Sequence, residues 1–327
     1  MPSFAQRLKA WFLLFRPWSF TATLVPFLIG LALAVGRPGG VCWTTWALGL
    51  VSGLFFQATV NLLNTWGDER SGVDAVPGAV RTTPQVHDGL VSMRELFVTA
   101  ALCALLAAMF GLAVCVYPGA RQQWIVNVPV LVAGCIGFLG ATNYSTGIKF
   151  KYRGLGVPFV AFLMGPLETF AALGLAVPPG QLVAANDVRT WGLFLAALLL
   201  CTLPLALHVC VIMHGNDMRD IPTDRQAGIR TTASMLGPRR ALQFYAFCHV
   251  VPPLMCLAFA LLYSCPWFLL PLVTLPLVAR TLANAVRVYR DAPDCPPWRG
   301  LERASGGIHC LFGTLYALAL YFVQTRM

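Results

Sequence analysis

The chain has 327 residues, of which 57% are hydrophobic and only 11% are charged, and its formal net charge is +10. This balance excludes an ordinary soluble domain and indicates a fold that is solvated by lipid. Basic charge can also attract nucleic acid. Here the positions of lysine and arginine along the chain explain the charge without a nucleic-acid partner, as described below.

Apolar stretches long enough to cross a bilayer recur from one end of the chain to the other. A helix needs about 20 mostly apolar residues to span the hydrocarbon core. We therefore predict an all-α integral membrane protein, with residues 1–327 forming a single domain. The nine expected spans are 18–35, 44–64, 95–117, 124–142, 155–176, 191–213, 241–263, 266–286 and 305–323. Because so few residues separate spans seven and eight, these two must form a tight helical hairpin.

Lysine and arginine are distributed unevenly between the two sides of these spans. With the N-terminus on the cytoplasmic side, 19 of the 23 basic residues lie on that side, and only Arg37, Arg121, Arg189 and Arg326 lie opposite. Cytoplasmic segments of membrane proteins carry such an excess. The pattern predicts a multi-pass protein of defined orientation. A cleavable signal peptide, ending in the Ala-Leu-Ala of residues 32–34, is the alternative interpretation of the N-terminus.

The first of two acidic clusters closes span two and continues into the loop after it. It contains Asn61, Asn64 and Asp68, and Asp74 follows in the loop. Since offsets of three and seven residues return to the same side of a helix, the first three are expected on one face. Only 13 acidic residues exist in the chain, and acids in a membrane protein generally mark function.

The second cluster closes span six and repeats this spacing. Asp217, Asp220 and Asp224 have the same offsets, and Asn216 precedes them. If the helix continued through them, they too would share one face. We therefore expect both acidic segments on the cytoplasmic side, at corresponding ends of even-numbered spans. The alternative is that both clusters are merely hydrated helix ends at the membrane surface.

Converging carboxylate and amide oxygens suit a hard cation such as Mg²⁺, which commonly joins a few carboxylates to the phosphates of a substrate. Arginine binds phosphate oxygens through two parallel hydrogen bonds. Four arginines stand in or near the clusters, namely Arg70, Arg81, Arg219 and Arg225. A diphosphate is the ligand that fits this combination of groups.

Several long motifs of the chain resemble those of the UbiA superfamily of intramembrane prenyltransferases, and in particular its menaquinone-type branch, the 1,4-dihydroxy-2-naphthoate prenyltransferases and their vertebrate relatives. The resemblance extends over nearly the whole chain. It rests on the Arg-Pro-Trp-Ser-Phe of residues 16–20, the N-x-x-N-x-x-x-D run at 61–74, Arg81, the Lys-Tyr-Arg-Gly-Leu-Gly of 151–156, the Gly-Pro-Leu of 165–167 and the N-x-x-R-D-x-x-x-D-R run at 216–231.

What the resemblance implies is a nine-helix bundle around a central cavity, in which Mg²⁺ joins the aspartate motifs to a prenyl diphosphate. Loss of pyrophosphate would leave an allylic carbocation. Metal ligands would be Asn64, Asp68, Asp220 and Asp224. Further diphosphate contacts would come from Asn61, Arg81, Lys149, Asn216 and Arg225, with Asp74 as another candidate. Tyr144 and Tyr152 would face the cation, whose charge an aromatic ring stabilises.

The chain departs from the branch pattern at positions that concern the acceptor. A carboxylate normally follows the Leu-Gly of the tyrosine motif, but this chain has Val157 and Pro158 there. Ala79 and Val80 replace the usual acids before Arg81. After the Gly-Pro-Leu motif the chain has Glu168, the one carboxylate within a predicted span. The chain therefore has the residues expected to ionise the diphosphate. It lacks the residues that usually recognise the acceptor in this branch.

Glu168 has two roles open to it from sequence. It could be a base that removes a proton from an acceptor phenol or from a terminal carbocation, or it could hydrogen-bond to a neighbouring helix. His208 and His214 precede the second acidic cluster, and we interpret both as hydrogen-bonded core histidines. The eleven cysteines are interpreted as small buried hydrophobic residues.

Three functions remain open. The leading hypothesis is transfer of a prenyl group to an aromatic acceptor of the quinone type. The second is a terpene cyclase of the same superfamily, in which the substrate's own double bonds attack the cation and no acceptor is needed. The third is a non-catalytic transporter or scaffold, which would require more polar residues in mid-span than the chain has.

Overall fold

A computed structural model of the chain describes residues 2–37, 39–71, 84–116, 128–145, 147–178, 181–183 and 187–326. These residues form helices and no extended strand. The elements are α1 (Phe4–Phe15), η1 (Pro17–Phe20), α2 (Thr21–Ala34), α3 (Trp43–Ser71), α4 (Pro84–His87), α5 (Met93–Val116), α6 (Val128–Ser145), η4 (Phe150–Tyr152), α7 (Gly156–Phe162), η5 (Leu163–Leu167), α8 (Glu168–Ala176), α9 (Val188–Arg219), α10 (Ile221–Gln226), α11 (Thr232–Leu262), η6 (Pro266–Thr274), α12 (Leu275–Asp291) and α13 (Leu301–Gln324).

Eight helical segments within the described residues are long and apolar enough to cross a bilayer. They correspond to eight of the nine predicted spans, so an all-helical, multi-pass membrane protein is confirmed. The remaining span, predicted at 124–142, corresponds to α6, whose apolar part Val128–Tyr144 is shorter than the others. Its predicted first residues lie outside the described ranges. The count of nine spans therefore stays a prediction.

Proline and glycine explain where several helices end or change form. The tight hairpin predicted between spans seven and eight is confirmed, since α11 ends at Leu262 and the 3₁₀ helix η6 begins at Pro266. α11 begins earlier than predicted, at Thr232, but Gly237 within it has a left-handed backbone with φ of 74°. A proline follows directly. The regular part of this span therefore begins close to the predicted residue 241.

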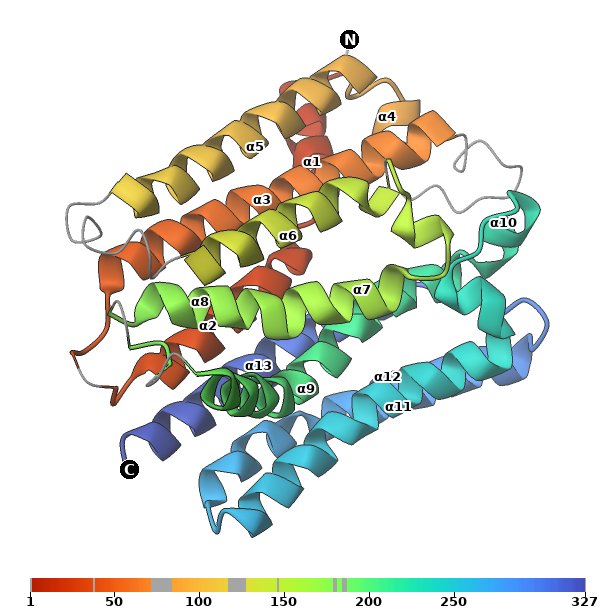
Figure 1. Ribbon diagram of the computed structural model, residues 1–327. Coiled ribbons are helices and arrows are strands. Elements are labelled where there is room, and N and C mark those ends of the chain that lie inside the picture. Colours follow the sequence, from red (N-terminus) through yellow and green to blue (C-terminus); the bar gives the residue numbers. More distant parts are fainter. Residues whose placement is uncertain are drawn as a thin grey trace.

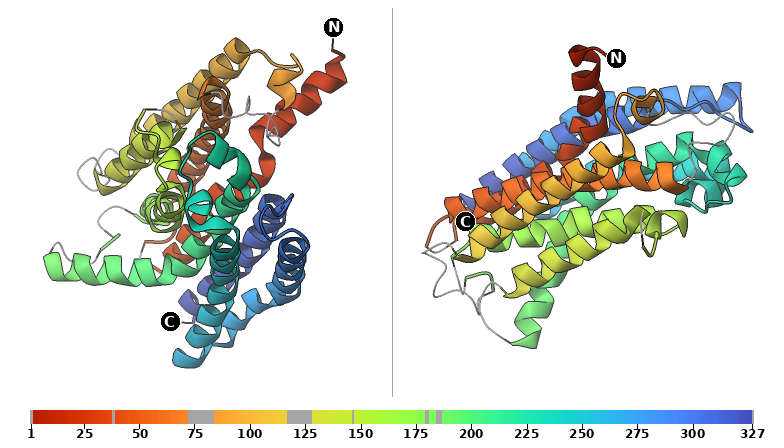
Figure 2. Two further views of the ribbon diagram at one scale, coloured as in Figure 1. Left: turned by 90° about the vertical axis from the view of Figure 1, so that its right-hand side faces the viewer. Right: turned by 90° about the horizontal axis from the view of Figure 1, so that it is seen from above.

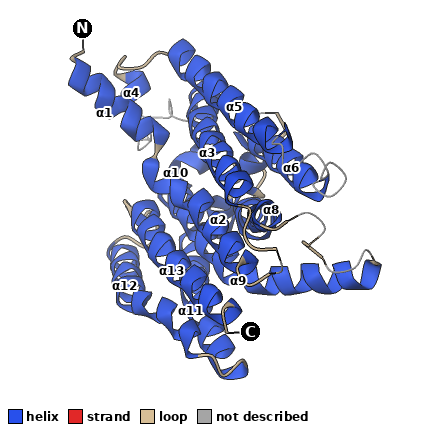
Figure 3. Ribbon diagram, turned by 90° about the vertical axis from the view of Figure 1, so that its left-hand side faces the viewer, coloured by secondary structure: helices blue, strands red, loops and turns tan. Residues whose placement is uncertain are grey.

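Helix α2 lies between α8 and α13 and packs against both (Figure 3). Two glycines allow this close approach. A Cβ atom added at Gly30 would lie 2.6 Å from the backbone nitrogen of Leu173 on α8, and one added at Gly313 on α13 would lie 2.1 Å from Val25. Small residues at helix contacts are typical of packing in membranes, where backbones approach closely.

The ends of α3 and α9, the connection from α6 to α7, and α10 all lie at one end of the bundle (Figure 1). The segments carrying the two acidic clusters therefore come together there, although they are far apart in sequence. α1 and the first part of α9 project away from the other helices (Figure 2). The remaining contacts of the long helices run along the bundle, as expected for apolar surfaces that span a membrane.

Candidate functional site at one end of the bundle

Asp68 is the centre of the first cluster and occupies the last turn of α3. Its carboxylate accepts hydrogen bonds from the Lys151 ammonium, at 3.0 and 2.9 Å, and from the Tyr152 hydroxyl at 2.5 Å. Both donors belong to the connection between α6 and α7. Asp68 is 7% exposed. The carboxylate thus joins α3 to a segment more than eighty residues away.

The charge of Lys151 is kept by its acidic surroundings. Burial alone would lower the pKa of this ammonium, but the negative charge of Asp68 outweighs that effect, so the pKa of Lys151 lies above its usual range. Lys151 therefore remains protonated at any physiological pH. A fixed positive charge stands against Asp68 at the point where the resemblance predicts a bound cation.

The second cluster differs from its predicted geometry. α9 ends at Arg219, Asp220 has a non-helical backbone, and the short helix α10 begins at Ile221. The expectation of one shared helical face for all three acids of this cluster is therefore wrong, because the helix does not continue through them. The expected loop position is not confirmed for Asp68, which lies on α3, or for Asp224, which lies on α10.

Asp220 and Asp224 have different partners. The Arg219 guanidinium donates two hydrogen bonds to Asp220, at 2.7 and 2.8 Å, and lies 3.7 Å from Glu302 on α13. Asp224 instead accepts a hydrogen bond of 2.7 Å from the Thr231 hydroxyl. Burial, reinforced by the charges of Asp220 and Asp68, raises the pKa of Asp224 to about 7 although the Thr231 bond lowers it.

The two clusters interact electrostatically with each other. Asp217 is buried and lies within the field of Lys151, and Asp224 lies within the fields of both Lys151 and Asp68. The prediction that the two acidic segments converge is therefore consistent with the structure at the level of these charges. Lys151 stands between the clusters and is shared by both.

Tyr144 closes the site from α6. Its ring is 4% exposed, and its hydroxyl is buried with no hydrogen-bond partner among the described residues. A Cβ atom added at Gly156, at the start of α7, would lie 2.9 Å from that hydroxyl, so a larger residue there would displace the Tyr144 hydroxyl. A buried hydroxyl that lacks a partner beside Lys151 and Asp68 is a group available to a ligand.

The remaining predicted residues have different surroundings. The Asn61 amide donates to the Phe15 carbonyl at 2.7 Å and to the Ser19 hydroxyl at 2.8 Å, and so attaches α3 to η1. Asn64 is buried one turn before Asp68. Three more stand at the same end with lesser burial: Asn216 is half-buried, and Lys149 and Arg225 are exposed. Arg81 and Asp74 lie outside the described residues.

Glu168 lies well away from this end, at the first residue of α8. The Gly-Pro-Leu motif before it forms a π-helical turn, η5, which interrupts the span. About 18 Å of helix separates Glu168 from Gly156. Its carboxylate interacts with Thr23 of α2, which is 1% exposed. Val157 is buried in the apolar contact between α7 and α9, together with Cys210 and Val211.

The two histidines predicted to be hydrogen-bonded in the core behave differently. His214 lies 2.9 Å from the Ala241 carbonyl through Nε2, as expected. His208 is fully buried, but neither of its ring nitrogens has a partner among the described residues, so the prediction is wrong for this residue. Its ring instead stacks on Phe312 with centroids 4.2 Å apart. Helical periodicity cannot distinguish a hydrogen-bonded histidine from a stacked one.

Lys151 and Thr231 contact the predicted acids Asp68 and Asp224 but were not predicted as site residues. Glu302, which was not predicted either, lies 3.7 Å from Arg219, one of the arginines expected to bind phosphate. Lys151 and Thr231 lie within the motifs quoted above, so their presence there was the available signal. Glu302 is on α13, far from either cluster in sequence, and no local pattern indicates it. Within the described ranges, no three carboxylate, imidazole or thiol groups are arranged closely enough to surround a metal ion by themselves.

A family model described as "UbiA prenyltransferase family" matches residues 23–305, which is most of the chain. The chain belongs to the UbiA prenyltransferase family. The resemblance to the superfamily inferred from its motifs is therefore confirmed, and with it the assignment to a family of prenyltransferase enzymes.

Relatives in this family include proteins from animals. The chain is 29% identical over 315 residues to the UbiA prenyltransferase domain-containing protein 1 homolog of Drosophila melanogaster, covering 96% of this chain and 79% of the relative. It is 30% identical to UbiA prenyltransferase domain-containing protein 1 of Danio rerio, with coverage of 95% and 83%. The Homo sapiens protein of that name is also 30% identical, with coverage of 84% and 75%.

Solved structures share the UbiA fold. A UbiA homolog from Archaeoglobus fulgidus bound to GPP and Mg²⁺ is 18% identical, has a TM-score of 0.60, and the match covers 96% of this chain and 99% of that one. The apo structure of a UbiA homolog from Aeropyrum pernix is 18% identical with a TM-score of 0.59, covering 94% and 98%. At these identities the likeness establishes the fold.

Proposed function

We propose that this protein ionises an isoprenoid diphosphate with the help of Mg²⁺ and transfers the prenyl group to an aromatic acceptor of the quinone-precursor type. The observation that carries the proposal is the meeting of the two acidic segments around Lys151, which interacts with Asp68, Asp217 and Asp224. Membership of the UbiA family supports it. A homolog of the same fold was solved with GPP and Mg²⁺ bound.

The charges at the site fit a divalent cation. Lys151 lies against Asp68 and Arg219 lies against Asp220, while Asp217 and Asp224 lie within the field of Lys151. Buried carboxylates are costly unless their charge is neutralised, so a divalent cation would be favoured here. Asn64, Asp68, Asp220 and Asp224 would hold Mg²⁺, which would neutralise the charge that develops on the departing diphosphate.

The chain's own residues would then have distinct tasks. Lys151, once a cation replaces it at Asp68, can donate to phosphate oxygens. The hydroxyl of Tyr152 holds Asp68 in place, and Arg219 holds Asp220. The faces of the Tyr144 and Tyr152 rings would stabilise the allylic cation. The apolar helices beyond Tyr144 would enclose the prenyl tail and exclude water, which would otherwise quench the cation.

The test measures ionisation and transfer separately. Purified protein is incubated with geranylgeranyl diphosphate and Mg²⁺, with and without a dihydroxynaphthoate acceptor, and both pyrophosphate and lipid products are measured. Transfer predicts a prenylated aromatic product only when acceptor is added, and EDTA should abolish pyrophosphate release. Formation of a cyclic hydrocarbon at the same rate with or without acceptor would contradict the proposal.

One observation favours the terpene cyclase as a second candidate. Glu168 is a carboxylate within the membrane span, deep along the helix from the acidic end, and its neighbour is the uncharged Thr23. A single base deep in an apolar mould is what a cyclase needs to remove the final proton. A transferase needs a polar group where the acceptor phenol binds, and Val157 is apolar and buried.

Substitution of Glu168 by glutamine separates these candidates. In a transferase that uses Glu168 as base, transfer should fall at least about tenfold while pyrophosphate release continues. In a cyclase, the mixture of hydrocarbon products should change without any acceptor present. The matched control is Glu95→Gln, which removes an acid in the first turn of α5, outside both acidic clusters. A Glu168→Gln protein with unchanged rate and products would show that the residue serves only packing.

We also propose that the acidic end of the bundle faces the cytoplasm. The 19 to 4 division of lysine and arginine supports this orientation. Cysteines introduced at Ser71 and Thr223 should both be labelled by an impermeant maleimide from the cytoplasmic side of sealed vesicles, and neither from the other side. Labelling of the two positions from opposite sides would exclude a shared site.

A further inference from the structure

A cavity lies at the same end of the bundle, between α12 and α13, and takes no part in the chemistry above. Its volume is about 850 Å³, within the range of ligand pockets. Four arginines line it, Arg280, Arg287, Arg299 and Arg303, and none of the described residues in its lining is acidic. Positive charge concentrated in one cleft attracts an anionic partner.

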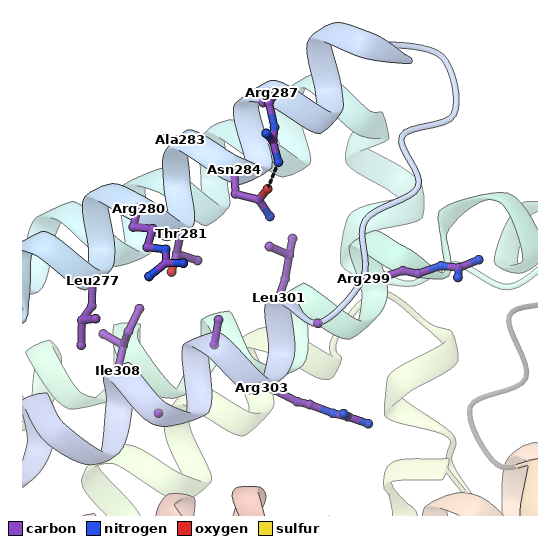
Figure 4. A pocket seen from close by; sticks show the side chains of 13 residues that line it. Leu277, Arg280, Thr281, Ala283, Asn284, Arg287, Arg299, Leu301, Arg303 and Ile308 are labelled. Atoms are coloured by element: carbon purple, nitrogen blue, oxygen red, sulfur yellow. Dashed lines mark hydrogen bonds between the residues drawn. The ribbon is translucent and has the colours of Figure 1, made fainter.

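The cleft has an apolar end and a basic end (Figure 4). Leu277 of α12 and Ile308 of α13 face each other at one end. Arg287 and Arg299 lie toward the other end. On the α13 side, small residues including Gly307 leave the cleft open, since a Cβ atom added at Gly307 would meet nothing within 4 Å. The cleft is therefore amphipathic along its length.

The position of the arginines along the span matches the edge of a bilayer. With rises of about 2.0 Å per residue in η6 and about 1.5 Å in α12, Arg280 lies about 25 Å along the axis from Pro266. The hydrocarbon core is about 30 Å thick. With Pro266 at the opposite edge of the core, Arg280 would therefore lie close to the core's edge, and Arg287, two turns later on the same face, would lie among the lipid headgroups. Leu277 remains at the depth of the acyl chains.

The arginines are available to a ligand. Arg280 and Arg299 form no hydrogen bond or ion pair with any described residue. Arg287 donates only to the uncharged amide of Asn284, at 3.0 Å. Glu302, next to Arg303 in sequence, interacts with Arg219 on the site side instead. Arg303 rests over the Trp18 ring at 5.0 Å and keeps its charge uncompensated.

We propose that the cleft between α12 and α13 binds an anionic phospholipid. The phosphate would lie beside the Arg280 and Arg287 guanidiniums, whose planar donors match phosphate oxygens, and one acyl chain would lie along Leu277 and Ile308. The side chains of Arg299 and Arg303 extend away from the cleft (Figure 4) and would add positive charge at its rim. Basic pockets between membrane helices recognise anionic headgroups in this way. The site is separate from the acidic cluster, so the lipid is a bound partner of the bundle and not its substrate.

The test is lipid retention measured by native mass spectrometry on the full chain in detergent. Phosphatidylglycerol is titrated against phosphatidylcholine with the same acyl chains. Wild-type protein should retain one phosphatidylglycerol about tenfold more tightly than phosphatidylcholine. The Arg280→Gln, Arg299→Gln double variant should lose this preference. Both substitutions are on exposed side chains, so the variant should keep the wild-type melting temperature when no lipid is added.

Two further variants separate the cleft from general charge. Arg239→Gln with Arg240→Gln removes two exposed arginines of α11 outside the cleft and should keep the preference. Gly307→Leu fills the cleft without removing charge and should weaken phosphatidylglycerol retention. An equal loss in the Arg239, Arg240 variant would overturn the proposal, as would full retention in the Arg280, Arg299 variant. Displacement of the lipid by inorganic pyrophosphate would assign the cleft to soluble diphosphate instead. None of these readouts depends on turnover.

Discussion

Asp68 and Asp220 each lie near the end of a membrane-spanning helix, yet their charges are balanced in different ways. Asp68 is bound by Lys151 and Tyr152, which come from another part of the chain. Asp220 is bound by Arg219, its neighbour in sequence. The first arrangement exists only when the bundle is assembled, whereas the second can form within a single turn of chain.

The difference follows from helix continuity. α3 continues through Asp68 to Ser71, so its acidic face is directed at the connection after α6. α9 stops before Asp220 and the chain restarts as α10, so Asp224 is turned toward Thr231 at the start of α11. Equal spacing in sequence thus placed one cluster on a continuous helix and divided the other between α9 and α10. The same chemical groups face the site from the end of α3, called the α3 side below, and from the break between two helices, called the α9–α10 side.

The largest effect is expected when a metal ligand is lost from either the α3 side or the α9–α10 side. Asp68→Ala and Asp220→Ala should each lower the rate of pyrophosphate release more than about a hundredfold, because each removes a carboxylate that would hold the cation in the transition state. Release is measured in the presence of saturating prenyl diphosphate and Mg²⁺.

Asp88→Ala, at an exposed position outside both clusters, is the matched control and should retain wild-type activity. Circular dichroism should show that all three variants keep their helices. Turnover above a tenth of wild type in both Asp68→Ala and Asp220→Ala would refute a metal site built from two motifs.

On the α3 side, removing the Lys151 ammonium should have a smaller effect, and its size should depend on whether Mg²⁺ is present. Lys151→Gln leaves Asp68 buried without its ammonium partner, which should lower the free energy of unfolding by about 2 kcal/mol in EDTA. Mg²⁺ should restore part of that loss, because a bound cation would replace the missing charge. The melting temperature is compared with and without Mg²⁺.

Lys149→Gln is the control. Lys149 lies two residues before Lys151, is exposed and forms no ion pair with Asp68. Its melting temperature should match wild type in both conditions. If Lys151→Gln and Lys149→Gln melted alike in EDTA, the ion pair at Asp68 would contribute nothing to stability.

The smallest effect is expected on the α9–α10 side, where the neutral Thr231 hydroxyl holds Asp224. Thr231→Val removes the hydroxyl that donates to Asp224 and caps α11 through Ser234, so it should destabilise the protein by about 1 kcal/mol. The Mg²⁺ concentration for half-maximal pyrophosphate release should rise a few-fold. Thr223→Val, which loses a hydrogen bond only to the Asp220 carbonyl, is the control. Equal curves for both variants would show that Thr231 does not orient Asp224.

Much of the fold could be predicted from the sequence, because a membrane imposes strong local rules. Every long apolar stretch had to become a helix that satisfies its own backbone, and the short connection before Pro266 forced a hairpin. The family was recognisable from long polar motifs such as the run at 61–74, which few other proteins need at the end of a span. Glu168 was also recognisable as an unusual acid within a span.

What composition and spacing determined, then, is that the chain crosses a membrane many times and that six of its 13 acids lie in two segments, while the resemblance of its motifs pointed to the UbiA prenyltransferases. The tertiary structure alone decided that Lys151 lies against Asp68, that Glu302 lies near Arg219, and that four arginines border one cleft. The physical reason is the range of the forces involved. Helix formation depends on neighbours a few residues apart, whereas a salt bridge between distant segments depends on how whole helices pack.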